Sequence, residues 1–238
     1  MPRRLALLAL LFTAGEVSAQ EEGIVPLNGV GRISVEGGWR LSSNQTFYDS
    51  FYALPGYLCS QDCARGSPGG PFLAGSFGYS FMENIELSID LFATGEQLKL
   101  TNAATLSNYT YGALVGLRFQ TLLEVLTPQG VVPFVGLETG PTLVFSEAKD
   151  VGRKELLQQP WVGTVGATFR LSPRWGVTAE YRLAFARGQS PYNERKPPDG
   201  VDANAYKGLA SYNAGGNWFA VGITYMFPPD PIRPFSSL

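Results

Sequence analysis

The residue types that carry most enzyme chemistry are scarce in this sequence. Its 238 residues contain no His, which excludes a His general base and any Ser–His or Cys–His pairing. Asp, Glu and Ser are present, but no pair of them at a catalytic spacing stands out. We therefore expect a protein that is not an enzyme.

The two cysteines form the next candidate site. Cys59 and Cys63 are separated by three residues. In an oxidising compartment such a pair is expected to form a local disulfide. A metal site is the alternative, but no His and no further Cys could complete a four-ligand set. The sequence therefore predicts a Cys59–Cys63 disulfide, no metal and no cofactor.

A third group consists of charged residues that alternate with apolar ones. Nine of them would share the polar face of the predicted strands: Glu36, Arg40, Glu86, Asp90, Arg118, Glu138, Arg170, Glu180 and Arg182. Five acids and four bases nearly balance, and enclosed charges must be paired. We predict an internal salt-bridge network, with Glu86 or Asp90 on Arg118 and Arg170 on Glu180. The alternative is a gated ion path, although selective paths usually show rings of one sign.

Strands with a two-residue period must position these charges. Eight segments beyond Gly29 place apolar side chains on one face and small, polar or charged ones on the other. Their ranges are 32–41, 73–81, 85–94, 109–120, 135–145, 161–171, 175–185 and 219–227. Each can be drawn at about ten residues, the length that a tilted strand needs to cross a bilayer. No apolar stretch beyond the N-terminus is long enough for a transmembrane helix.

The connections and the aromatic residues separate a membrane barrel from a soluble one. Short connections at 82–84, 122–130 and 172–174 alternate with long ones at 43–70, 95–108, 146–159 and 187–216. Aromatic residues gather at both strand ends and aliphatic residues between them, as in the girdles of outer-membrane barrels. Only 16% of residues are charged, against about a quarter in soluble domains. The fold predicted is all-β: an eight-stranded antiparallel up-and-down transmembrane β-barrel.

The predicted barrel divides the chain into four regions. Residues 1–19 are predicted to be a cleaved signal peptide, with Arg3 and Arg4 before an apolar run and a small-residue cleavage site at 17–19. Residues 20–29 would be a short periplasmic N-terminal segment, 30–227 the barrel, and 228–238 a Pro-rich periplasmic tail. The net charge of −2 shows no basic excess, so nucleic acid is not expected as a partner.

The last strand carries a family resemblance. Gly222-Ile223-Thr224-Tyr225-Met226-Phe227 is similar to the C-terminal insertion signal of outer-membrane barrels. With the signal peptide and eight segments, residues 30–227 resemble the small outer-membrane β-barrel family that includes the OmpA transmembrane domain. The resemblance implies a bacterial outer-membrane location, contact with membrane lipid and lipopolysaccharide, and insertion by the barrel-assembly machinery through the last strand. Unlike full-length OmpA, a Pro-rich tail follows instead of a peptidoglycan-binding domain.

Three functions remain open at this stage. We expect a structural or surface-binding role carried by the external loops, with a lumen closed by the charged network. One alternative is a narrow channel for small solutes, which planar-bilayer conductance would reveal. The other is a soluble, lipocalin-like ligand-binding barrel, which would be apolar inside and polar outside.

Overall fold

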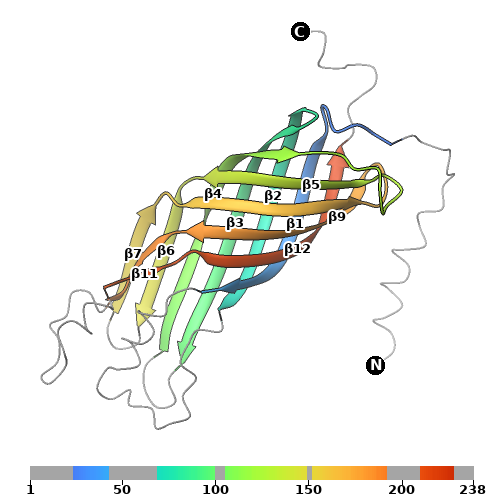
Figure 1. The fold of residues 1–238 in the computed structure, drawn as a ribbon. Helices are drawn as coiled ribbons and strands as arrows, with labels where there is room; N and C mark the ends of the chain where they lie inside the picture. The colour runs from blue at the N-terminus through green and yellow to red at the C-terminus, as the bar shows by residue number, and fades with distance from the viewer. Residues whose placement is uncertain (1–23, 43–68, 100–104, 149–151, 192–209, 228–238) are drawn as a thin grey trace, which may run out of the picture.

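The computed structural model describes residues 24–42, 69–99, 105–148, 152–191 and 210–227. The described residues form twelve β-strands (Figure 1). In chain order they are β1 (Gly31–Leu41), β2 (Gly70–Met82), β3 (Ile85–Lys99), β4 (Thr105–Gln120), β5 (Val131–Thr139), β6 (Thr142–Ala148), β7 (Gly152–Gln158), β8 (Trp161–Arg170), β9 (Trp175–Phe185), β10 (Arg187–Gln189), β11 (Ser211–Asn213) and β12 (Gly216–Phe227). The predicted signal peptide, the Pro-rich tail, Cys59 and Cys63 lie outside the described residues.

Hydrogen bonding between neighbouring strands closes the sheet on itself. Ten strands pair in the order β3-β2-β1-β12-β9-β8-β5-β4-β6-β7, and β3 also pairs with β4. Strands β5 and β6 both pair with β4 and form one wall element, interrupted at Gly140 and Pro141. Strands β7 and β8 continue one another across Pro160 in the same way. Proline lacks the N–H that a ladder needs, which accounts for both interruptions.

The remaining short strands complete the count of wall elements. Strands β10 and β11 pair with each other and extend the β9–β12 pair in the same register. The wall therefore consists of eight elements: β1, β2, β3, β4, β5–β6, β7–β8, β9–β10 and β11–β12. All pairings are antiparallel. The eight-stranded antiparallel barrel predicted from the alternation is confirmed.

The two ends of the barrel differ in how far the strands extend. One end has the short connections 83–84, 121–130 and 171–174. At the other end we predicted long connections over 95–108 and 146–159, and this was wrong for most of their length. There β3 runs on to Lys99, β4 starts at Thr105, and β6 and β7 form a hairpin. A ladder requires only backbone groups, so the polar side chains of this region do not end it.

The barrel is apolar outside and charged inside. Val35 and Leu91 point outward and are 61% and 62% exposed, whereas Arg118 and Glu138 point inward and are 1% exposed. A lipocalin-like barrel would have the opposite arrangement. A continuous apolar outer wall is the surface that acyl chains cover in transmembrane barrels.

Aromatic residues mark both edges of the apolar wall. At the short-connection end, Tyr225 packs edge-on against Trp175 and Phe227, with ring centroids 4.9 and 4.8 Å apart. At the other end Trp39 and Trp161 are exposed on the outer wall. This distribution matches the two girdles expected from the sequence. In the part of the chain that the structure describes, no helix is long and apolar enough to span a membrane.

The N-terminal segment closes the short-connection mouth. Of the predicted segment 20–29, the structure describes 24–29. The backbone N–H of Gly29 donates to the carbonyl of Ser80 (2.7 Å), and the N–H of Ser80 donates to that of Val30 (3.0 Å). Leu27 and Val30 are buried against the barrel. The segment therefore packs as a floor under the lumen.

Candidate functional site

All nine charged residues predicted to point inward are buried in the barrel. The inward side chains of β3 show how the lumen is layered, because they follow one another along the barrel. Glu86 comes first, near the short-connection end, followed by Asp90, Phe92 and Glu96. They belong, in that order, to an ion pair, a charged cluster, an apolar layer and a second ion pair. The lumen is thus filled in four layers.

We call the second layer the middle cluster; its members are Glu36, Asp90, Arg118, Glu138, Glu180 and Arg182. Arg118 donates to Asp90 Oδ2 at 3.0 Å and to Glu138 Oε1 from both Nε (3.1 Å) and Nη2 (3.0 Å). Arg182 lies within salt-bridge distance of all four carboxylates: Glu180, Asp90 (2.5 Å), Glu138 (3.5 Å) and Glu36 (3.5 Å). Two guanidinium groups therefore hold four carboxylates together.

The other two charged layers are one-to-one ion pairs. Toward the short-connection end, Arg32 binds Glu86 through two hydrogen bonds of 2.9 and 2.8 Å. Toward the long-connection end, Arg40 Nη1 lies 3.5 Å from Glu96 Oε2. Arg40 Nε also donates to the carbonyl of Gly215. Both pairs are buried, so each charge has its counter-charge beside it.

The predicted pairings are partly different in the structure. Asp90 does contact Arg118, but Glu86 is paired with Arg32, which the predicted network left out. The pairing of Arg170 with Glu180 was wrong. Arg170 Nη1 instead donates to the carbonyl of Val25 at 2.7 Å, in the N-terminal floor.

Glu96 was also missed, because we expected a loop from residue 95 onward. Its inward position follows from the same alternation that placed Glu86 and Asp90, continued past residue 94. The two-residue alternation, continued past residue 94, would therefore have predicted the inward position of Glu96, whereas the polar composition of the segment indicated a loop. Arg32 likewise stood on the polar face in the sequence pattern.

Glycines create the space in which the charged side chains lie. Seven buried charged residues have Gly as a direct cross-strand partner: Arg32 with Gly78, Glu36 with Gly222, Arg40 with Gly70, Arg118 with Gly136, Glu138 with Gly116, Arg170 with Gly176 and Glu180 with Gly166. At Gly222 and Gly116 an added Cβ would lie 2.5 Å from the Cγ of the paired glutamate and closer still, 2.2 and 2.3 Å, to a backbone carbonyl oxygen of the neighbouring strand. At Gly78 it would lie 2.5 Å from the carboxyl carbon of Glu86, which reaches across β2 to Arg32. The glycines are thus part of the network.

An apolar layer separates the middle cluster from the outer ion pair. Trp218 is buried between Phe72 and Phe92, with ring centroids 5.0 and 4.9 Å away. The layer consists of Phe72, Ala74, Phe92, Leu114, Val162, Ala184, Trp218 and Ala220. Charged layers lie on both sides of this apolar layer. The lumen therefore contains neither a continuous polar path nor a continuous apolar path along the part of the barrel that the structure describes.

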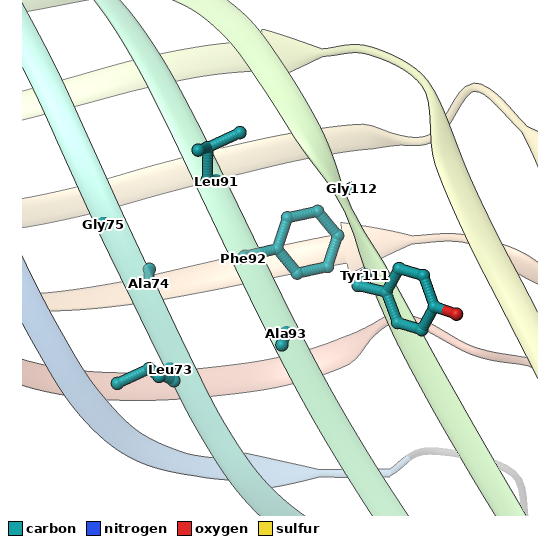
Figure 2. Close-up of a pocket in the computed structure, with 8 residues that line it drawn as sticks. All are labelled: Leu73, Ala74, Gly75, Leu91, Phe92, Ala93, Tyr111 and Gly112. Carbon is teal, nitrogen blue, oxygen red and sulfur yellow. The ribbon is translucent and has the colours of Figure 1, made fainter.

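A shallow groove lies on the outer wall over β2, β3 and β4 (Figure 2). Its volume is about 430 Å³. Gly75 leaves open space between Leu73 and Leu91, and Tyr111 bounds the groove on β4. The wall beneath it is unbroken, since β3 and β4 stay paired from Ile85 to Lys99. The groove therefore does not open into the lumen.

The fold and the interior define the class of protein. A closed barrel of eight antiparallel wall elements, with an apolar outer band and a charged, filled interior, is a small β-barrel of the outer-membrane type. Within the described residues, no group of His, Cys, Asp and Glu side chains could hold a metal ion.

Comparison with known proteins agrees at the level of fold. No protein-family model matches the chain, and no curated protein matches it by sequence. Among solved structures, Neisserial surface protein A is 13% identical, with a TM-score of 0.50, and the match covers 84% of this chain and 100% of that one.

Two further matches are attachment invasion locus protein of Yersinia pestis and OprG of Pseudomonas aeruginosa. The first is 12% identical over 84% of this chain and 99% of that one, with a TM-score of 0.49. The second is 12% identical over 85% and 98%, with a TM-score of 0.46. At such identities a likeness concerns the fold alone, and the match to Neisserial surface protein A confirms the predicted resemblance to small outer-membrane barrels in that sense.

Proposed function

We propose that the protein is a closed, non-conducting barrel of the bacterial outer membrane whose binding role lies at its outer end. The observation that supports this most directly is the filled lumen, with two ion pairs, a charged cluster and an apolar layer stacked along it. An eight-stranded barrel has an interior only wide enough for side chains. The proposal includes no catalysis and no nucleic-acid partner.

The outer end offers a surface because the wall continues past the aromatic girdle. We call this part the outer extension. It consists of β6, β7, the part of β3 after Gly95 and the part of β4 before Tyr109. On its outward face Arg153 forms an ion pair with Glu155 (2.9 Å) and lies 4.3 Å above the Phe145 ring. Leu157 on the same face is 69% exposed. Phe145 itself is buried beneath Arg153, so the groups exposed on this face are the apolar Leu157 and the charged Arg153 and Glu155.

We propose lipopolysaccharide as the neighbour that this face contacts, because its sugars and phosphates surround a barrel at that level. The predicted external loops 43–70 and 187–216 would add to the surface, although 43–68 and 192–209 lie outside the described residues. Export by the signal peptide, and insertion by the assembly machinery through β12, remain parts of the proposal.

Conductance tests the closed lumen. The full mature chain, refolded and inserted in planar bilayers, should show no reproducible conductance steps when the salt concentration or the pH is varied. Regular steps of constant size would contradict the closed barrel and favour the narrow-channel alternative.

A shortened hairpin tests the outer extension. Gln97 and Ser107 are direct cross-strand partners, so an Asn-Gly turn can join them in place of 98–106. The barrel below should still fold and show heat-modifiable gel migration. Binding of the nanodisc-embedded variant to purified lipopolysaccharide should be weaker than that of the wild type. Equal binding would show that the β3–β4 end of the extension does not contribute, because Arg153 and Leu157 on β7 remain in this variant.

A further inference from the structure

The middle cluster contains an excess of negative charge. Its four carboxylates, from Glu36, Asp90, Glu138 and Glu180, face the two guanidinium groups of Arg118 and Arg182. All six side chains are at most 6% exposed. If every group carried its ordinary charge, two carboxylates would lack a counter-charge inside a barrel that lipid surrounds.

Neighbouring elements do not supply the missing positive charge. The Arg32 guanidinium on β1 donates two hydrogen bonds to Glu86 on β3 and reaches Glu36 only through the Ser34 hydroxyl, and Arg40 is paired with Glu96. Arg170 on β8 donates to the carbonyl of Val25 in the N-terminal floor. The cross-strand partners of Asp90, Arg182 and Glu36 on strands β2, β8 and β12 are Ser76, Thr164 and Gly222. These groups carry no charge. The excess is therefore a property of the cluster itself.

Two carboxylate oxygens of the cluster have no hydrogen-bond partner. They are Asp90 Oδ1 and Glu180 Oε2, both fully enclosed; Arg118 Nη2 lies 3.8 Å from Glu180 Oε2, beyond hydrogen-bond distance. A buried ionised oxygen without a donor is strongly disfavoured. An added proton removes the charge and supplies a donor for a neighbouring carboxylate oxygen.

We propose that the middle cluster is a proton-binding site that holds about two protons in the folded barrel at neutral pH. The protons come from water and convert carboxylates to carboxylic acids, which donate hydrogen bonds within the cluster. Because all four carboxylates lie within salt-bridge distance of the same guanidinium, that of Arg182, the protons belong to the cluster and not to a single residue.

The direction of the pH dependence follows from proton counting. An exposed Glu in the unfolded chain loses its proton at a pH of about 4.3. Above that pH the folded barrel binds more protons than the unfolded chain, so its stability falls as the pH rises. The chain has no His, so few other groups titrate between about pH 6 and 9. The exceptions are the α-amino group and, if reduced, Cys59 and Cys63.

Glu36→Gln and Glu86→Gln form a matched pair of tests. Glu36 has the weakest contact with its arginine, a single approach of 3.5 Å, whereas Glu86 binds Arg32 one to one. The full mature chain is unfolded by urea in detergent micelles at pH 6.5 and pH 9. The wild-type midpoint should be lower at pH 9. Glu36→Gln should keep or raise the midpoint at pH 9 and lose about half of the pH shift.

The control should behave in the opposite way. Glu86→Gln, which unbalances a matched pair, should lower the midpoint at both pH values and leave the pH shift in place. If both variants lower the midpoint equally and neither alters the shift, the proposal is wrong. A wild-type midpoint that does not change with pH would also overturn it.

Two measurements keep the proposal testable if a variant folds poorly. Infrared spectra of the folded wild type at pH 7 should show a carboxylic-acid carbonyl band that is absent after unfolding at the same pH. Replacing sodium by choline in the buffer should leave the midpoint at pH 9 unchanged. A midpoint that depends on sodium would mean that a metal cation, not a proton, neutralises the cluster.

Discussion

Replacing Arg118 with Met should be among the most damaging single changes in the barrel. Met keeps an unbranched apolar stem but is shorter than Arg and loses three charge-assisted hydrogen bonds, to Asp90 and Glu138, at 3.0–3.1 Å. Arg182 would then be the only guanidinium facing four buried carboxylates. Removing one partner of a buried pair costs about 3–5 kcal/mol, because the remaining charge stays enclosed. The folding equilibrium should shift by about a hundredfold to several thousandfold.

The exposed pair on the outer extension provides a control. Arg153 and Glu155 are 2.9 Å apart, but both side chains are 53% exposed. Water screens such a pair, and Arg153→Met should cost only about 0–1 kcal/mol. Both variants are compared by urea titration in micelles, following heat-modifiable gel migration and tryptophan fluorescence. A loss below about 1 kcal/mol for Arg118→Met would refute the view that its pairing is buried and essential.

Three further changes test other layers of the barrel. Gly78→Val should lower the free energy of unfolding by about 1–3 kcal/mol, because the new side chain displaces the Glu86 carboxylate. Gly75→Val, which points into open space on the outer wall, should change it by no more than about 0.5 kcal/mol. Similar urea midpoints for the two variants would contradict this. Trp218→Ala should cost about 3–5 kcal/mol and still show no conductance in planar bilayers, because charged layers remain on both sides. Arg170→Met should speed hydrogen exchange in the N-terminal floor, since it removes the hydrogen bond to Val25; unchanged exchange would argue against that role.

The sequence was most informative about which way side chains point. A strand places alternate residues on opposite faces, so the inward direction of Asp90, Arg118 and Glu138 followed from the period alone. Strand number and closure followed from the number of such segments and the lengths of their connections. The lengths of β3 and β7 did not, because polar residues outside the membrane can either continue a ladder or form a loop.

The partners of the charges could not be predicted in the same way. Glu86 and Arg118 are direct cross-strand neighbours on β3 and β4, and Glu86 was one of the two partners predicted for Arg118, the other being Asp90. In the structure Glu86 reaches across Gly78 on β2 to Arg32, and Arg118 extends toward Asp90 and Glu138. A partner across the lumen depends on register and strand tilt, which alternation does not contain.

The glycines suggest how a single sequence could have carried more of this information. A charged side chain in a narrow lumen cannot stand upright toward the axis, since other side chains occupy it, so it must lie over the wall beside it. The neighbouring strand accepts it most easily where no Cβ intervenes, as at Gly222 beside Glu36, Gly116 beside Glu138 and Gly136 beside Arg118. Inward glycines that face inward charges therefore restrict the register of adjacent strands. Four of the six members of the middle cluster, Glu36, Arg118, Glu138 and Glu180, are paired with glycines in this way. Asp90 and Arg182 complete the cluster from positions paired with Ser76 and Thr164, so the register that places the first four charges over glycines also brings the other two beside them.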